Sequence, residues 1–173
     1  MDDLVVWLRA QLDEDERTAR AAMNAVSRAP LPGAGQWRYA ESGADEGGRY
    51  WSITTVAPND MVPTVEVVGS GMSGGGVHEE ALARHIAEHD PARVLREIDA
   101  KRAMVDAYAE ADAMSRATSE NYGAWVNSEP LPHPEEAEGT AEVKDRLKGL
   151  HYALRLLALP YADRPGYRDD WRP

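Results

Sequence analysis

The spacing of the apolar residues changes twice along this chain, and that change limits the fold more than any other feature. Up to about Ser27, apolar residues recur at helical intervals with acids and arginines between them. From Gln36 to Val68 the chain is rich in β-branched and aromatic residues, separated by turns of glycine, aspartate and asparagine. Helical spacing returns from Val77 onwards. The pattern predicts an α+β fold, with helices before and after a short β-meander.

The first helix is predicted over residues 1–27, where Asp2 or Asp3 can cap its amino end. Its apolar stripe comprises Leu4, Leu8, Leu12, Ala19, Met23 and Val26. The acidic run from Asp13 to Arg17 fits a solvated helix face better than a binding patch. Prolines and glycines between residues 30 and 35 then end the helix.

Three strands are predicted within residues 36–68 as an antiparallel meander. They cover residues 36–41, 50–56 and 62–68. In the middle strand Trp51 and Ile53 share one face, which we expect to pack on the helices. Trp37 and Tyr39 can extend that face, or can form with Trp51 an exposed aromatic strip that binds a small ligand.

Residues 69–76 read GSGMSGGG and contain the Gly-x-Gly-x-x-Gly spacing of dinucleotide-binding loops. A dinucleotide-binding unit also needs a parallel strand after the following helix, with an acidic residue at its end. Here another long helix follows the first, so we interpret the segment as a flexible linker.

A pair of helices is predicted over residues 77–118, broken at Asp90 and Pro91. Proline restricts the residue before it, and here Asp90 can cap the second helix with Pro91 in its first position. The second helix carries one long apolar stripe: Val94, Ile98, Val105 and Tyr108, widened by Leu95 and Met104.

Residues 119–139 contain three prolines and an acidic run, and we predict a loop there. Thr140 can cap a last helix over residues 140–159. Its stripe is Val143, Leu147, Leu150, Leu154 and Leu157. The tail, residues 160–173, is polar but keeps three aromatic residues, Tyr161, Tyr167 and Trp171. We expect an ordered tail that lies across the core or, as we favour, docks on a partner.

The composition describes one domain, residues 1–173, of ordinary size. The 30 acids against 19 lysines and arginines give a formal charge of -11, which would repel nucleic acid. No run of residues is long and apolar enough for a membrane span, and the acidic start is unlike a signal peptide. The chain has no cysteine, which suits a reducing cytoplasm.

The most suggestive chemical motif is His-x-x-Glu-His at His85, Glu88 and His89. Two histidines four residues apart on a helix can share one zinc ion, and Glu88 would then activate a metal-bound water. The third ligand would have to come from elsewhere, with Glu97, Glu110, Glu142 and His151 as open alternatives. A helix end explains His89 equally well, since its imidazolium suits the carboxyl end of the dipole. We therefore predict neither a metal nor any other cofactor.

Three stretches of the chain resemble an uncharacterised family of small actinobacterial proteins, known as a domain of unknown function. They are DDLVVWLRAQLDEDER, HIAEHDPARVLREIDAKRAMVDAY and LHYALRLLALPYADRPGYRDDWRP. The resemblance spans both ends and the middle of the chain. It implies a cytoplasmic actinobacterial or phage-borne protein, but it carries over no activity and no catalytic residue.

These observations favour a non-enzymatic interaction or regulatory protein of the cytoplasm. No serine lies in a nucleophile elbow, and we assign no catalytic residue. The expected partner is another protein or a second copy of the chain, engaged through an acidic surface and the aromatic tail residues. The alternative is a metal-dependent hydrolase centred on His85, Glu88 and His89.

Overall fold

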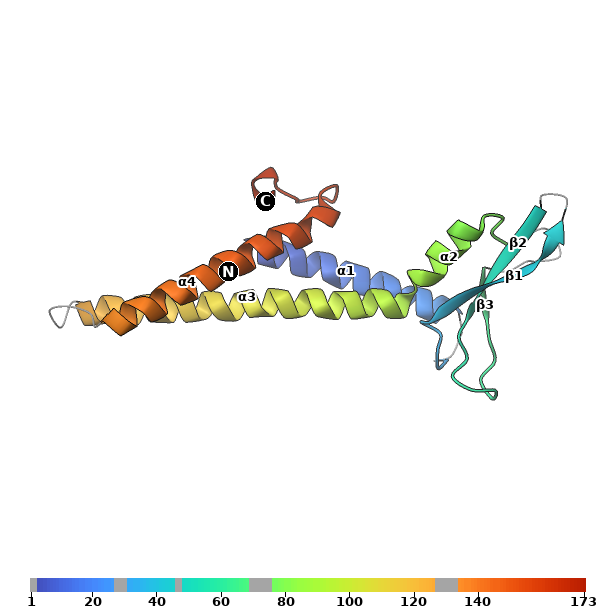
Figure 1. Ribbon diagram of the computed structural model, residues 1–173, viewed down its shortest axis with the longest axis horizontal. Helices are drawn as coiled ribbons and strands as arrows, with labels where there is room; N and C mark the ends of the chain where they lie inside the picture. Colours follow the sequence, from blue (N-terminus) through green and yellow to red (C-terminus); the bar gives the residue numbers. More distant parts are fainter. Residues whose placement is uncertain (1–2, 27–30, 46–47, 69–75, 127–133) are drawn as a thin grey trace. The chain divides into compact units, whose positions relative to one another are not determined.

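The computed structural model describes residues 3–26, 31–45, 48–68, 76–126 and 134–173 (Figure 1). The contacts divide the chain into two units, each containing part of α1, Asp3–Val26, and part of α3, Pro91–Val126. The helical unit consists of Met1–Leu12 and Asp99–Pro173, and the sheet unit consists of Asp13–Ile98. No helix in the described part of the chain is long and apolar enough to cross a bilayer.

The sheet unit contains a three-stranded antiparallel sheet, as the sequence predicts. Its strands, β1 Trp37–Asp45, β2 Gly48–Thr55 and β3 Glu66–Val68, follow one another in chain order. The third strand is shorter than predicted, because Asn59 begins a turn and Pro63 has no amide hydrogen for a ladder. The first strand runs past its predicted end at Glu41, with a bulge between Glu41 and Gly43.

One face of this sheet packs against α2, Glu80–Glu88. Ile53 is fully buried there with Ala83 and Ala87, and Trp51 packs at the edge of the same cluster. This confirms the predicted inward face of the middle strand. Trp37 and Tyr39 extend that face, since β1 pairs Tyr39 with Ile53 in register.

The helix predicted over residues 77–89 starts later, at Glu80. Val77 is buried and forms a β-bridge with Trp51, in which each amide donates to the other residue's carbonyl oxygen. Pairing of an apolar residue to the sheet edge therefore replaces the first predicted helical turn. Residues 69–75, the greater part of the predicted glycine linker, lie outside the described residues.

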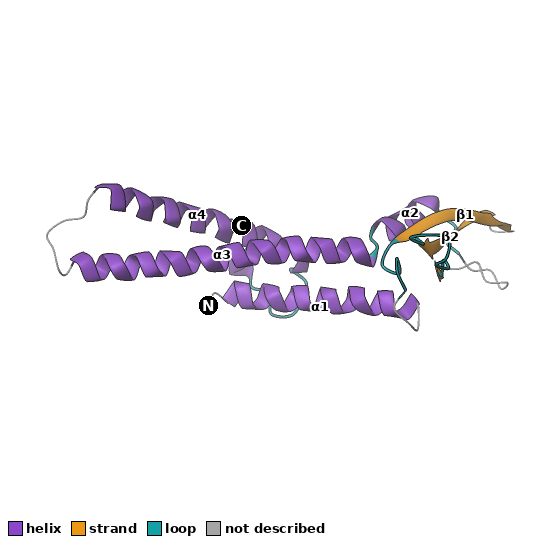
Figure 2. Cartoon of the chain, turned by 90° about the horizontal axis from the view of Figure 1, so that it is seen from below, coloured by secondary structure: helices purple, strands orange, loops and turns teal. Residues whose placement is uncertain are grey.

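The helical unit contains the first turns of α1, most of α3, and α4, Pro134–Ala158. The helices α3 and α4 run antiparallel, side by side (Figures 1 and 2). Much of its core comes from the predicted stripes, namely Leu4, Leu8, Leu12, Val105, Tyr108 and Leu154. Ala158, which lies outside the predicted stripe, is also buried. An ion pair of 2.8 Å between Arg9 and Asp106 joins α1 to α3 at the surface.

The prediction of a loop over residues 119–139 is wrong for most of these residues, which are helical. Helix α3 continues to Val126, and α4 begins at Pro134 rather than at Thr140. A helix tolerates Gly123 in its interior, and proline is favoured in a first helical position because its missing amide has no helical partner there. Residues 127–133 lie outside the described part.

The tail after α4 is ordered, as predicted, and contains two short 3-10 helices, Leu159–Tyr161 and Asp169–Trp171. Its three aromatic rings pack around Trp7, with ring centroids 5.2 to 6.4 Å from the indole. The indole N–H of Trp7 donates to the carbonyl oxygen of Pro165 at 3.0 Å. The tail therefore closes onto the first turns of α1.

Candidate functional site

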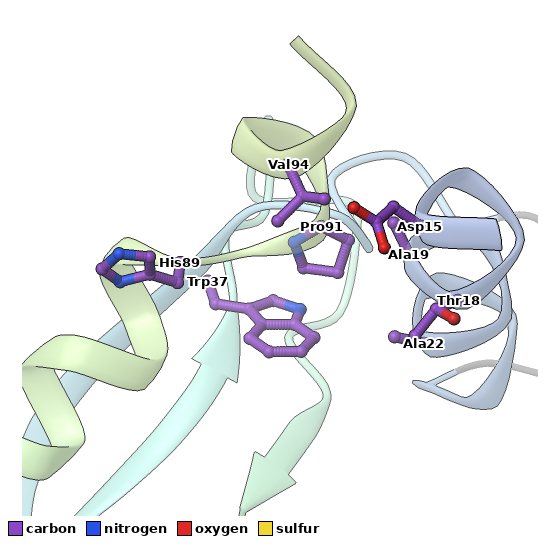
Figure 3. Close-up of a pocket in the computed structure, with 8 residues that line it drawn as sticks. All are labelled: Asp15, Thr18, Ala19, Ala22, Trp37, His89, Pro91 and Val94. Carbon is purple, nitrogen blue, oxygen red and sulfur yellow. The ribbon is translucent and has the colours of Figure 1, made fainter. Parts of the chain in front are cut away.

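A small hollow lies in the sheet unit, where the second half of α1 meets the start of β1 and the junction of α2 with α3 (Figure 3). Its volume is about 230 Å³. The described residues that line it are Asp15, Thr18, Ala19, Ala22, Trp37, His89, Pro91 and Val94. The described lining residues are mainly apolar, and Asp15, Thr18 and His89 add a carboxylate, a hydroxyl and an imidazole.

One wall of the hollow is a single face of α1. Asp15, Thr18, Ala19 and Ala22 are spaced by three or four residues, so their side chains point the same way. The two alanines leave space that larger side chains would fill. The hydroxyl of Thr18 donates to the carbonyl oxygen of Glu14 at 3.1 Å, which leaves its methyl group to the wall.

The opposite wall is the indole of Trp37, which the preceding turn and α3 fix in place. Its ring N–H donates to the carbonyl oxygen of Ala34 at 3.0 Å, and its backbone N–H donates to Asp90 at 3.2 Å. Gly33 in this turn has φ +82°, and a Cβ there would overlap the carbonyl oxygen of Val56. The ring is therefore presented to the hollow by a turn that only glycine fits.

Asp90 performs the predicted capping role and also orients Trp37. One carboxylate oxygen accepts the N–H of Arg93 at 2.7 Å, and the other accepts the N–H of Trp37. We expect Asp90→Ala to lower the free energy of unfolding by about 1–2 kcal/mol, because a helix cap and a part-buried hydrogen bond are both lost.

Urea unfolding of the variant measures this loss. Asp99→Ala is the matched control, because Asp99 is an exposed aspartate of the same helix and should change stability by less than about 0.5 kcal/mol. Equal stabilities of the two variants would contradict the double role of Asp90.

The histidine motif ends α2, as one of its two interpretations predicts. His89 is the residue after the helix, and its Nδ1 lies 2.8 Å from the carbonyl oxygen of His85. The two rings are 4.1 Å apart between centroids, and both residues are exposed. His78 lies before the helix, with its ring 6.3 Å from Tyr50.

The motif gains no third ligand from the described residues, among which no three His, Asp or Glu side chains form a cluster suited to a metal ion. Of the motif residues, only His89 lines the hollow, and Glu88 is exposed. The structure thus places His89 at the edge of the hollow and does not gather the motif residues around one point.

The aromatic residues of the predicted strip lie in different places. Trp37 lines the hollow, whereas Trp51 lies beside His78 and Arg84 at the other end of α2. The hydroxyl of Tyr39 accepts a hydrogen bond from Arg84 at 3.0 Å. That bond, with a smaller contribution from Glu80, raises the pKa of Arg84 above its ordinary value. Tyr39 therefore anchors α2 to the sheet.

The tail residues assigned to partner binding lie within the helical unit. Tyr161 is 3% exposed and Trp171 is 8% exposed, and Tyr167 packs edge-on against both Trp7 and Trp171. Binding of a partner by these rings would require the tail to leave Trp7. Their role toward a partner remains a prediction.

The sequence offered little to identify the hollow itself. The sequence makes Trp37 a candidate ligand-binding residue and His89 a candidate metal ligand. Of the α1 wall, it places Asp15 on a solvated face and Ala19 in an apolar stripe, and it assigns no role to Thr18 or Ala22. The available signal was the pair of alanines, Ala19 and Ala22, where a core-facing helix usually has larger side chains.

Comparison with known proteins agrees with the resemblance in the three quoted stretches. No curated protein and no protein of solved structure is significantly similar to the chain. A family model described as a family of unknown function, DUF6221, matches residues 1–173. The protein is therefore a member of this family, DUF6221, over its whole length.

Proposed function

We propose that this protein is a non-enzymatic interaction protein of the cytoplasm, and that the hollow beside Trp37 receives one arginine or lysine side chain of a basic partner protein. The observation that carries the proposal is the composition of the lining, in which an aromatic ring, small apolar side chains and a carboxylate surround one space. The absence of cysteine from the chain supports a reducing compartment.

The size of the hollow favours a single side chain over a cofactor. Sites for drug-sized ligands and cofactors measure roughly 300–1,000 Å³, which exceeds the 230 Å³ available here. The lining also favours binding over catalysis. Among the described lining residues only Thr18 has a hydroxyl, and that hydroxyl donates its hydrogen bond to the carbonyl oxygen of Glu14. The Nδ1 atom of His89 is likewise directed to a backbone carbonyl.

The chemistry of the lining favours a positively charged side chain with a long apolar stem. A cation over an indole face gains about 0.5–2 kcal/mol, depending on its exposure, and Trp is the best ring for this contact. The alanines and Val94 suit the methylene groups of the stem, and the Asp15 carboxylate attracts the charged end. The formal charge of -11 would increase the rate of encounter with a basic partner.

Three peptides with capped ends test which kind of side chain the hollow binds. Each has glycines around one central residue, which is arginine, its uncharged isostere citrulline, or norleucine. The measurement is the shift of the Trp37 indole N–H signal in NMR titrations, identified among the 5 tryptophans by its loss in Trp37→Phe. We expect the arginine peptide to bind in the millimolar range and the other two at least about tenfold more weakly.

A variant that fills the hollow supplies the structural test. Ala22→Leu places a larger side chain into the hollow and should weaken arginine binding by at least about tenfold. Ala21→Leu is the control, because Ala21 is the exposed neighbour on the same helix and both substitutions suit a helix. Equal binding by arginine and citrulline peptides, or full binding by Ala22→Leu, would show the proposal to be wrong.

A further inference from the structure

A second hollow, of about 450 Å³, lies in the sheet unit at the amino end of α2. The described residues that line it are Trp51, His78, Glu79, Glu80, Ala81 and Arg84. Like the hollow beside Trp37, it combines an indole, a small apolar side chain and carboxylate groups. The two ends of α2 therefore carry hollows of similar chemistry.

The formal charges in the second hollow sum to a negative value. The Arg84 guanidinium lies 3.1 Å from the Glu80 carboxylate, which balances its charge. Glu79 occupies the N-cap position of α2, but its carboxylate makes no capping hydrogen bond. The Glu79 carboxylate thus adds a negative charge to the hollow that Trp51 lines. A carboxylate and an indole together attract a cation, as Asp15 and Trp37 do in the first hollow.

Two elements give the same distance between the hollows. In the sheet, Trp37 pairs with Thr55 and Glu41 pairs with Trp51, so the two tryptophans are four residues apart along the strands and one strand apart. That offset places their backbones about 14 Å apart. On α2, Glu80 lines the second hollow and His89 the first, and nine residues of helix also rise about 14 Å.

The two hollows lie on the same side of α2, that of β1. Trp37, Tyr39 and Trp51 belong to the face of the sheet on which α2 packs. Arg84 reaches from α2 to Tyr39, where its Nε donates to the hydroxyl and its guanidinium carbon is 5.8 Å from the ring centroid. Because Arg84 lines the second hollow and β1 supplies Trp37 to the first, one extended chain that passes Tyr39 can reach both.

We propose that the basic partner binds as an extended segment with two basic residues four positions apart, one in each hollow. The inference rests on the proposed function, because one of these side chains occupies the hollow beside Trp37. In an extended segment, residues four apart are separated by about 13 Å, and their side chains point to the same side. Each contact strengthens the other, since binding of one side chain holds the second near its site.

Four capped peptides of equal length test the pairing. One has arginine at two positions four apart, two have citrulline in place of one or the other arginine, and the fourth has its two arginines at neighbouring positions. All other positions are threonine, because β-branched residues favour an extended backbone. The fourth peptide has the charge of the first, but its arginine side chains point to opposite sides in an extended chain.

NMR titrations of the full chain follow the indole N–H signals of Trp37 and Trp51, assigned by their loss in Trp37→Phe and Trp51→Phe. With the first peptide we expect both signals to shift together, with a Kd at least about tenfold below those of the citrulline peptides. The peptide with neighbouring arginines should stay within about threefold of the citrulline peptides, because it gains only from its greater charge.

Glu79→Gln separates this inference from the proposed function. The variant should lose most of the gain from the second arginine and keep the Trp37 shift caused by a citrulline peptide. Asp60→Asn is the control, because Asp60 is an exposed carboxylate of the same unit that lines neither hollow, and this variant should bind all four peptides like the natural chain.

The outcomes distinguish the two proposals. Binding of one arginine beside Trp37 with no gain from the second, an equal gain from neighbouring arginines, or a full gain in Glu79→Gln would overturn this inference alone. No shift of the Trp37 signal with any arginine peptide would overturn the proposed function, and this inference with it.

Discussion

Trp7→Ala is expected to lower the free energy of unfolding by about 3 kcal/mol, near the lower end of the range for removal of a packed tryptophan because the ring is partly exposed. Trp7 is the point at which both ends of the helical unit meet. Its indole contacts Tyr161, Tyr167 and Trp171, and its N–H holds the carbonyl of Pro165. Alanine would leave a cavity that the three rings are too large to fill without moving.

Urea unfolding followed by circular dichroism measures the loss, and proteolysis of the tail adds an independent measurement. The variant should release residues 160–173 to protease at urea concentrations that leave the natural chain intact. Val6→Ala, next to it on the exposed side of α1, should change stability by less than about 0.5 kcal/mol. A tail as protected in Trp7→Ala as in the natural chain would show that other contacts hold it.

Ile53→Ala is expected to be about as damaging, with a loss of about 3–4 kcal/mol from the sheet unit. Ile53 is fully buried at the centre of β2, where it pairs with Tyr39 on one side and Val68 on the other. The residues above it on α2 are Ala83 and Ala87, which have no side-chain length with which to fill the space. The cavity therefore remains, and its cost adds to the lost burial.

Amide hydrogen exchange is the suitable measurement, because it reports on the strands separately from the long helices. Protection of β1 and β2 should fall in Ile53→Ala, while the described amides around Leu154 keep theirs. Met61→Ala supplies the control, since Met61 is 89% exposed in the same unit. Uniform loss of protection over both units would contradict the assignment of this core to the sheet unit alone.

The elements could be predicted because their signals are local. Alternation identified Trp51 and Ile53 as the inward face, and helical spacing identified Val105, Tyr108 and Leu154 as core. Asp90 and Pro91 marked the start of α3 because a cap and a restricted backbone angle depend on neighbouring residues alone. Such features need no knowledge of distant contacts.

The errors arose where tertiary contacts outweighed local preference. Val77 continues a helical pattern, yet it pairs with Trp51, which is distant in sequence. Prolines suggested a loop over residues 119–139, but Pro134 is the first residue of α4. The hollow was beyond prediction for the same reason, because its lining combines α1, β1 and α3, and nothing local to Ala22 indicates that Trp37 faces it.

The closure of the tail on Trp7 also bears on the order in which the protein is assembled. Trp7 and Pro165 are 158 residues apart in the chain, so a ribosome must make the whole sequence between them before they can meet. The sheet unit is continuous from Asp13 to Ile98 and can fold while synthesis proceeds. Leu4, Leu8 and Leu12 gain their buried environment only later. During synthesis, the first turns of α1 are thus an apolar segment available to a chaperone.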